Sequence, residues 1–230
     1  MGIKIAIDGP SGSGKSTIAK ALAKQLDFVH IDTGAMYRAV ALAAKKSGID
    51  LSNEAAVVKL TDTIDIDIKH TYGSQHIFLG EEDVTADIRT AEMGLAASKV
   101  SAYEGVRKKL VDLQRKLASD GDVVMDGRDI GTVVLKNADV KIFLAADIKI
   151  RTERRCKELE SLGYNYNCEE IAAQIIKRDA DDSSRDFAPL KPAEDAVHLD
   201  VSHLDVCGAV AAIIEIAAER GVSICTLLQE

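Results

Sequence analysis

A glycine-rich loop near the amino end constrains the fold more than any other feature of this sequence. Residues 9–16 read Gly-Pro-Ser-Gly-Ser-Gly-Lys-Ser and fit the phosphate-binding pattern G-x-x-x-x-G-K-[ST]. An apolar run of strand length, residues 3–8, precedes the loop, and apolar residues at helical spacing follow it over 16–26. Strand, loop and helix stand in the order that places backbone N–H groups and a helix N-terminus around an anion. The sequence therefore predicts an α/β fold with a nucleoside triphosphate site after its first strand.

The residue types in this loop suit a magnesium nucleotide. Glycines let phosphate oxygens approach the backbone, the Lys15 ammonium reaches the β- and γ-phosphates, and the Ser16 hydroxyl is a ligand for Mg²⁺. We therefore expect Mg²⁺ as cofactor, bound together with ATP as co-substrate. The expected ATP-binding residues are Gly9, Pro10, Ser11, Gly12, Ser13, Gly14, Lys15, Ser16 and Thr17.

The composition narrows the classes of partner. The 230 residues include 47% hydrophobic and 29% charged residues, which is ordinary for a soluble globular protein. The formal net charge of −8 argues against a protein that coats nucleic acid, since such proteins usually carry a basic excess. No apolar stretch approaches the roughly 18 residues of a membrane span, and no signal peptide is recognisable. We expect a cytoplasmic monomer that binds neither nucleic acid nor membrane.

The cysteines give no sign of a metal or redox site. They have neither C-x-x-C spacing nor a companion histidine cluster, so we expect scattered, buried and reduced thiols. The four are Cys156, Cys168, Cys207 and Cys225.

Strand-like runs alternate with helical runs along much of the chain, which is typical of a parallel sheet flanked by helices. The first strand, at 3–8, and four further apolar runs predict a five-stranded parallel core sheet. The four are residues 28–31, 122–126, 140–145 and 197–201. Helices are expected over about 34–46 and near 207–219.

Two regions interrupt this alternation. Over 63–85 the apolar period becomes two, with a turn at Tyr72-Gly73-Ser74, which predicts a small antiparallel β insert. Residues 90–119 are expected to return to helix. The segment 147–190 is charged and rich in arginine, and it contains a Gly/Asn break at 162–167 between two helical stretches. This pattern favours a mobile lid; the alternative is a solvated helical hairpin with no role.

Arginines beside acids recur in three polar clusters, at 32–38, 126–129 and 178–185. Arginine suits bidentate phosphate contacts, and neighbouring carboxylates can accept from sugar hydroxyls or base amines. The clusters therefore predict a second, phosphate-bearing substrate. The N-K-x-D motif of GTPases is absent.

A helical face in the lid segment and an acid at a strand end complete the predicted chemistry. Arg151, Arg154 and Arg155 stand at i, i+3 and i+4, where they can clamp a transferring phosphoryl group. Asp126 ends an apolar run and can hold Mg²⁺ through a water molecule; the alternative is an ion pair with Arg128 or Lys15. His30 and His70 are expected to be packing or surface residues.

Five stretches carry a resemblance to a known family. They are GPSGSGKST at 9–17, DTGAMYR at 32–38, EDVTADIRT at 82–90, DGRDIGTVV at 126–134 and APLKP at 188–192. Together they resemble the nucleoside monophosphate kinases, and most closely the bacterial cytidylate kinases, over essentially the whole chain.

The resemblance implies an acceptor site for CMP. It gives Arg38, Arg128 and Arg185, with Thr33, to the CMP phosphate; Ser98, Arg107 and Asp129 to the cytosine base; and Arg178 and Asp182 to the sugar hydroxyls. It also implies a P-loop core over 1–32, 120–147 and 187–230, a monophosphate-binding domain over 33–119 including the insert 63–85, and a lid over 148–186.

The activity that follows is in-line transfer of the γ-phosphoryl group of Mg·ATP to CMP or dCMP. Lys15, Arg128, Arg154 and Arg155 are the expected catalytic residues, because a loose transition state needs alignment and charge neutralisation. Two alternatives stay open: a P-loop kinase for UMP or a non-nucleotide acceptor, and a nucleotide-switched binding protein.

Overall fold

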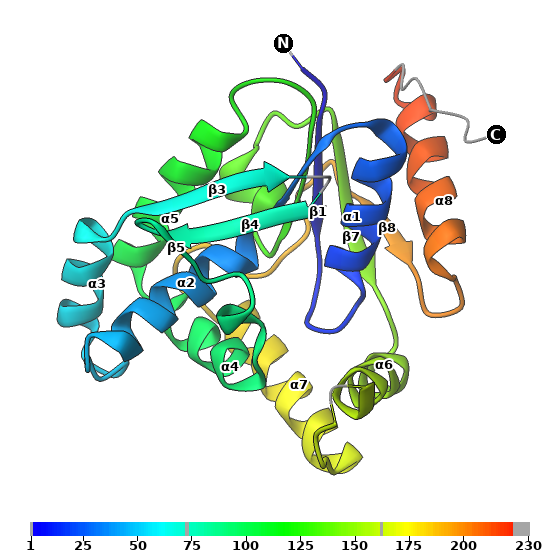
Figure 1. The fold of residues 1–230 in the computed structure, drawn as a ribbon. Helices are drawn as coiled ribbons and strands as arrows, with labels where there is room; N and C mark the ends of the chain where they lie inside the picture. Colours follow the sequence, from blue (N-terminus) through cyan, green and yellow to red (C-terminus); the bar gives the residue numbers. More distant parts are fainter. Residues whose placement is uncertain (1, 72–73, 162, 223–230) are drawn as a thin grey trace.

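A five-stranded parallel sheet forms the centre of the protein in the computed structural model, which describes residues 2–71, 74–161 and 163–222 (Figure 1). The strand order is β2-β6-β1-β7-β8, and every neighbouring pair is parallel. The bounds are β1 Lys4–Asp8, β2 Val29–Asp32, β6 Val123–Gly127, β7 Val140–Ala145 and β8 Val197–Asp200. The predicted five-stranded parallel sheet is confirmed.

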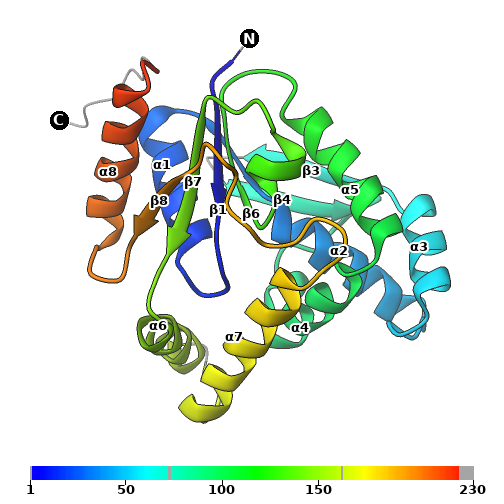
Figure 2. The same cartoon turned by 180° about the vertical axis from the view of Figure 1, so that it is seen from behind.

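Helices cover both faces of this sheet (Figures 1 and 2). Successive side chains of β1 point to opposite faces, and apolar ones need cover on both. Ile5 and Ile7 pack on one face with α1 (Lys15–Leu26) and α8 (Val206–Glu219). On the other face Ala6 packs with residues of α5 (Glu104–Leu117) and of the π-helical turn η2 (Ile130–Val134). The inner strands β6, β1 and β7 are therefore largely buried on both sides and hold the loops at their ends in place.

A second lobe carries the predicted antiparallel insert, which is confirmed as the sheet β3-β4-β5. Its elements are α2 (Thr33–Lys46), α3 (Glu54–Thr63), β3 (Ile66–Thr71), β4 (Ser74–Leu79), β5 (Glu82–Asp83), η1 (Asp87–Arg89) and α4 (Ala91–Val100). Apart from β5, whose two residues are exposed, these elements and α5 share one apolar cluster, distinct from the two clusters of the core sheet. Two residues of the expected turn, Tyr72 and Gly73, lie outside the described residues.

Two details of this lobe differ from the sequence expectation. The stretch 90–119 is not one helix: Ser101–Tyr103 separates α4 from α5. Helix α3 was not assigned from the pattern, although Asn53 caps it by accepting a hydrogen bond from the N–H of Ala56 at 3.1 Å.

The lid segment forms the two expected helices, α6 (Ile148–Ser161) and α7 (Cys168–Ser183). Both lie beyond the end of the core sheet at which β1 leads into the glycine-rich loop, as Figures 1 and 2 show from opposite sides. The expectation of buried thiols is wrong for Cys168 and Cys207, which are exposed, whereas Cys156 is buried. No helix in the described part of the chain is long and apolar enough to cross a membrane.

Candidate active site

The glycine-rich loop is fixed by close contact with the neighbouring strand. A side chain at Gly9 would place a Cβ atom 2.3 Å from the carbonyl oxygen of Leu144 in β7, so only glycine fits there. Gly14 stands just before α1 with φ at 93°, a left-handed conformation that favours glycine. The loop therefore ends at the free N–H groups of a helix N-terminus, which is the geometry of an anion site.

Lys15 lies inside this loop with only 5% of its surface exposed. Its Nζ donates to the carbonyl oxygen of Pro10 at 2.6 Å and lies 3.3 Å from the Ser13 hydroxyl. Burial, and next the positive charge of Arg128, hold the pKa of Lys15 well below its usual range. A phosphate in the loop would compensate this cost, because its negative charge favours the ammonium form.

Ser16 and Asp126 meet at the carboxyl end of the core sheet. The Ser16 hydroxyl donates to Oδ2 of Asp126 at 2.7 Å, and Oδ1 of Asp126 lies 2.8 Å from Nε2 of His30. The partners of Asp126 are thus Ser16 and His30, so the alternative pairing with Arg128 or Lys15 is wrong. His30 is more than a packing residue, since it touches the carboxylate directly.

This pair of oxygens fits Mg²⁺. A hydroxyl and a carboxylate are hard oxygen ligands, and nucleotide-bound Mg²⁺ uses one or two protein groups together with phosphates and water. In the described residues no group of three or more His, Cys, Asp or Glu side chains could hold a metal by itself. The observed pair therefore suits a metal that arrives with the nucleotide.

A cluster of half-buried arginines surrounds the buried Asp182 of α7. Arg128 donates from Nε to Oδ2 of Asp182 at 2.9 Å, and Arg185 donates to Oδ1. Burial alone would raise the pKa of Asp182, but these two charges hold it below its usual range. Burial and, next, the charge of Arg128 lower the pKa of Arg178 to about 10. The positive charge of Arg38 also lowers it. One acid thus faces several guanidinium groups, which leaves donors for further acceptors.

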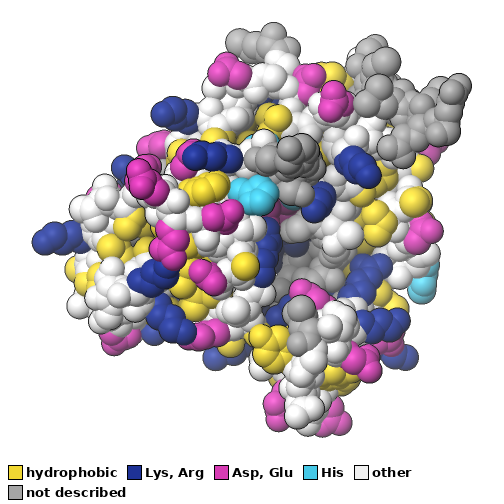
Figure 3. Space-filling model, in the orientation of Figure 1, with side chains coloured by type: hydrophobic (Ala, Val, Ile, Leu, Met, Phe, Trp, Pro, Cys, Tyr) yellow, Lys and Arg dark blue, Asp and Glu magenta, His cyan; other side chains and the backbone are white. Residues whose placement is uncertain are grey.

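The surface has a hollow on the face drawn in Figure 3. Figure 3 shows the hollow between the insert, the core sheet and the lid, with Lys and Arg side chains gathered around it. The positive charges of Arg128 and Arg178 also lower the pKa of Lys15. The cluster and the glycine-rich loop therefore interact electrostatically.

Arg107 and Asp129 form a second buried pair next to this cluster. Arg107 is 1% exposed and donates from Nη1 to Oδ2 of Asp129 at 3.1 Å and to the Tyr37 hydroxyl at 3.2 Å. Its Nε is buried without a hydrogen-bond partner. Burial raises the pKa of Asp129 although Arg107 opposes this. The unpaired Nε–H of Arg107 and the carboxylate of Asp129 supply a donor and an acceptor, which suits hydrogen bonding to the polar edge of a ring.

The lid arginines divide into two groups. Arg151 and Arg154 donate to the carbonyl oxygens of Ser11 and Ser13, at 3.0 and 3.2 Å, and so join α6 to the loop. Arg155 instead donates to Glu158 at 2.6 Å. These contacts place the lid directly on the phosphate-binding loop.

Two further sequence-predicted residues, Thr33 and Ser98, lie on α2 and α4. Thr33, the first residue of α2, donates its hydroxyl to the carbonyl oxygen of Asp126 at 2.8 Å. Ser98 lies on α4, and its carbonyl oxygen accepts from the hydroxyl of Ser101, which also receives a hydrogen bond from Arg185 at 2.9 Å. This contact of Ser98 involves its backbone and not its side chain.

Comparison with known proteins identifies the family. The chain matches the family described as "Cytidylate kinase" over residues 5–219. The chain belongs to the cytidylate kinase family. It is similar to the cytidylate kinase of Caldicellulosiruptor bescii, with 47% identity over 93% of this chain and 95% of the relative. It is also similar to that of Lactobacillus johnsonii, with 44% identity over 95% of both chains.

Solved structures show the wider fold to which this cytidylate kinase family member is similar. The overall arrangement matches an uncharacterized protein from Eubacterium ventriosum with a TM-score of 0.52 and 15% identity, covering 95% of this chain and 99% of the other. It matches the shikimate kinase of Bacteroides thetaiotaomicron with a TM-score of 0.50 and 12% identity, covering 94% and 98%. At such identities the likeness concerns the fold alone.

Several residues of the candidate site were not found from the sequence. Tyr37 lies inside the cluster 32–38 but is uncharged, and nothing in the spacing of Ser101 sets it apart from core or surface residues. Asp179 of α7 accepts from the N–H of Ser11 at 2.9 Å and also from Arg151. The only signal for Asp179 was its place inside the arginine–acid cluster 178–185.

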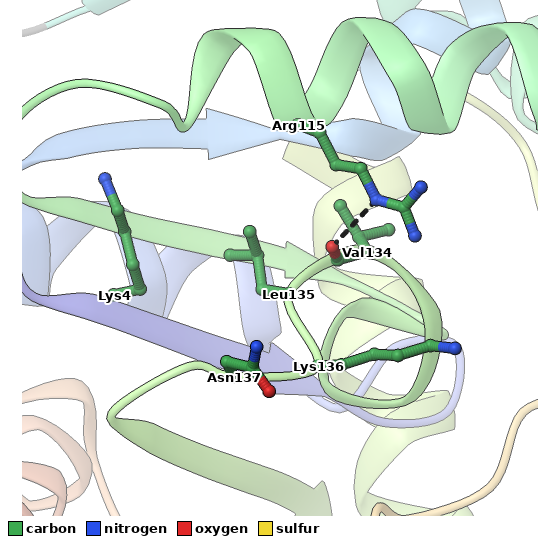
Figure 4. A pocket seen from close by; sticks show the side chains of 6 residues that line it. All are labelled: Lys4, Arg115, Val134, Leu135, Lys136 and Asn137. Atoms are coloured by element: carbon green, nitrogen blue, oxygen red, sulfur yellow. Dashed lines mark hydrogen bonds between the residues drawn. The ribbon is translucent and has the colours of Figure 1, made fainter.

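A separate shallow pocket lies at the other end of the core sheet of this cytidylate kinase family member (Figure 4). It is lined by Lys4, Arg115, Val134, Leu135, Lys136 and Asn137. Lys4 begins β1, whereas the glycine-rich loop follows the last residue of that strand. The pocket is therefore remote from the candidate active site.

Proposed function

We propose that this protein transfers the γ-phosphoryl group of ATP to CMP, and to dCMP, giving ADP and CDP or dCDP. The observation that carries the proposal is the excess of guanidinium groups over acids around Asp182. These groups are close enough to the glycine-rich loop to lower the pKa of Lys15. Family membership supports cytosine as the base of the acceptor.

The donor half of the reaction uses the loop. The residues from Gly9 to Thr17 hold the phosphates of ATP through backbone N–H groups, and Lys15 supplies a charge to the β- and γ-phosphates. Ser16 and, through water, Asp126 hold Mg²⁺. Bound with ATP, Mg²⁺ neutralises negative charge on the phosphate oxygens.

The acceptor half uses the half-buried arginines. Arg38, Arg128 and Arg185, with Thr33, hold the acceptor phosphate; a phosphate offers these donors more oxygens than Asp182 does now. Arg178 and Asp182 bind the sugar hydroxyls. Ser98, Arg107 and Asp129 contact the base, with Asp129 accepting from the exocyclic amino group.

The chemical step needs positioning more than covalent catalysis. Arg128 aligns the acceptor oxygen, while Lys15, Arg154 and Arg155 stabilise the equatorial oxygens of the transferring group. The lid, residues 148–186, excludes water that would otherwise hydrolyse ATP. We also propose that the chain is a monomer. Its P-loop core comprises residues 1–32, 120–147 and 187–230, and its monophosphate-binding domain comprises residues 33–119.

A panel of acceptors tests the proposal. ADP release from Mg·ATP is measured with CMP, dCMP, UMP, AMP and shikimate under identical conditions. We expect ADP formation that saturates with CMP and dCMP and is much slower with AMP and shikimate. Slow ATP hydrolysis that no acceptor accelerates would instead indicate a nucleotide-switched binding protein.

A further inference from the structure

Two cysteines face each other between the lid helices. Cys156 lies in α6 and Cys168 is the first residue of α7, twelve positions further along the chain. Their Sγ atoms are 2.7 Å apart. Cys156 is 5% exposed, whereas Cys168 is exposed to solvent. This is the one place in the described part of the chain where two free thiols are in contact.

Both cysteines lie in helices. Cys156 lies in the third turn of α6, with Thr152 and Leu159 buried on the same helix. Cys168 is held at the start of α7 by Asn167, whose side chain accepts from the N–H of Glu169 at 2.8 Å. A disulfide bond has an S–S distance of about 2.05 Å, so a further approach of less than about 1 Å suffices.

We propose that Cys156 and Cys168 are an oxidation-dependent modification site, at which a small-molecule disulfide converts the two thiols into an intramolecular cross-link between the lid helices. This goes beyond the proposed phosphoryl transfer and does not depend on the identity of the acceptor.

The reaction has two exchange steps. The Cys168 sulfur, as thiolate, attacks one sulfur of the oxidant and releases one small thiolate, which leaves a mixed disulfide on Cys168. The Cys156 sulfur then attacks Sγ of Cys168 and releases the second small thiolate. The two cysteine protons end on the two released thiols, the cysteine pair loses two electrons, and the oxidant gains them.

The environment sets the order of these steps. Burial, and next the neighbouring Cys168 thiol, raise the pKa of Cys156 to about 11, so this sulfur is protonated at neutral pH and shielded from solvent. Cys168 therefore meets the oxidant first. Cys156 reacts second, and its partner is then already at contact distance.

The cross-link would act on the helices that carry the lid's functional groups. Arg154 and Arg155 precede Cys156 on α6, and Asp182 follows Cys168 on α7. Since the thiols already touch, the bond preserves the observed packing of α6 on α7 and restricts their separation.

Peptide mapping tests the site. The full-length protein is incubated with glutathione disulfide, remaining thiols are alkylated, and tryptic peptides are analysed without reduction. We expect a linked pair of peptides containing Cys156 and Cys168, lighter by two hydrogen atoms than the two reduced peptides together, which dithiothreitol separates. We also expect the oxidised protein to melt at a higher temperature than the reduced protein.

Two matched variants serve as controls. Cys168→Ser replaces an exposed side chain and should abolish both the linked peptides and the rise in melting temperature. Cys207→Ser, at an exposed position on α8, should leave both unchanged. Glutathione retained on Cys168 with Cys156 still open to alkylation would overturn the proposal, as would a linked pair that involves any other cysteine.

Discussion

At the residue scale, the same guanidinium groups take part in the folded structure and in the proposed binding of substrate. Arg128 and Arg185 both donate to Asp182, which is 2% exposed. Loss of one arginine leaves the other as partner of the carboxylate, so the fold tolerates the change better than substrate binding does. Single substitutions can therefore separate the acceptor half of the site from the donor half.

Replacement of Arg128 by Ala should lower kcat/KM for CMP about ten- to a hundredfold, since one charge-assisted hydrogen bond contributes roughly 1.5–3 kcal/mol. The Kd for ATP should change little. Steady-state kinetics with varied CMP, together with direct ATP binding, measure both quantities. Arg220→Ala, far along the chain on the C-terminal side of α8, is the matched control. An equal loss of ATP affinity in R128A would show that Arg128 is not specific to the acceptor.

Asp126 gives a second prediction at this scale. Asp126→Asn keeps the shape of the side chain but removes the charge beside Ser16, and loss of an indirect metal partner typically weakens metal binding about ten- to a hundredfold. The Mg²⁺ concentration for half-maximal activity at fixed ATP should rise by a similar factor, with little change in KM for CMP. Asp139→Asn, near the opposite end of the sheet, is the control. An unchanged Mg²⁺ dependence would remove Asp126 from the metal site.

Most charged residues of the candidate site were predicted from the arginine–acid clusters, whereas Arg107 lies outside them and was predicted from the family resemblance alone. The sequence did not reveal how they pair. That His30 contacts Asp126, and that Tyr37 supports Arg107, depends on which strand and helix lie next to each other. Such contacts join residues tens of positions apart, and local spacing carries no information on them.

At the element scale, Asp8 fastens the end of β1 to the turn η2. Its carboxylate accepts from the N–H groups of Ile130 and Gly131, both at 2.8 Å. Burial nevertheless raises the pKa of Asp8 from 3.8 to about 7. The folded state therefore retains a proton on Asp8 at pH values where the unfolded chain has already lost it.

The raised pKa of Asp8 makes the free energy of unfolding depend on pH. Stability from this group is fully present below about pH 4 and is lost as the pH rises through about 7, on the order of a few kcal/mol in all. The free energy of unfolding in urea, measured between pH 5 and pH 8, should fall more steeply for the wild type than for Asp8→Asn. Any constant offset from the altered hydrogen bonds does not affect this difference in slope. Parallel profiles would contradict the raised pKa.

Elements were predicted well where apolar periodicity is strong and poorly where it is weak. The inner strands β6, β1 and β7 follow apolar runs because both faces of the sheet are buried there. Helix α3 buries only Val57 and Thr61 among its own residues, so its apolar stripe is narrow. The interruption at Ser101–Tyr103 lacks glycine and proline, the residues that usually mark a helix end.

At the scale of the whole molecule, apolar clusters hold the core sheet and the second lobe together, and arginine contacts join the lid to the glycine-rich loop. The core sheet presents the glycine-rich loop, the second lobe presents α2 and α5, and the lid brings α6 and α7 to the loop through Arg151 and Arg154. The candidate site lies where these parts meet. Phosphoryl transfer without hydrolysis requires all three at once, which no single motif could establish.

The fate of the γ-phosphate tests this account most directly. ATP labelled at the γ position is mixed with the protein, Mg²⁺ and CMP, and the label is followed in CDP and in inorganic phosphate. The account predicts that the label passes to CDP with almost none in inorganic phosphate, and that it stays in ATP when CMP is omitted. Release of the label as inorganic phosphate at the same rate with and without CMP would contradict it.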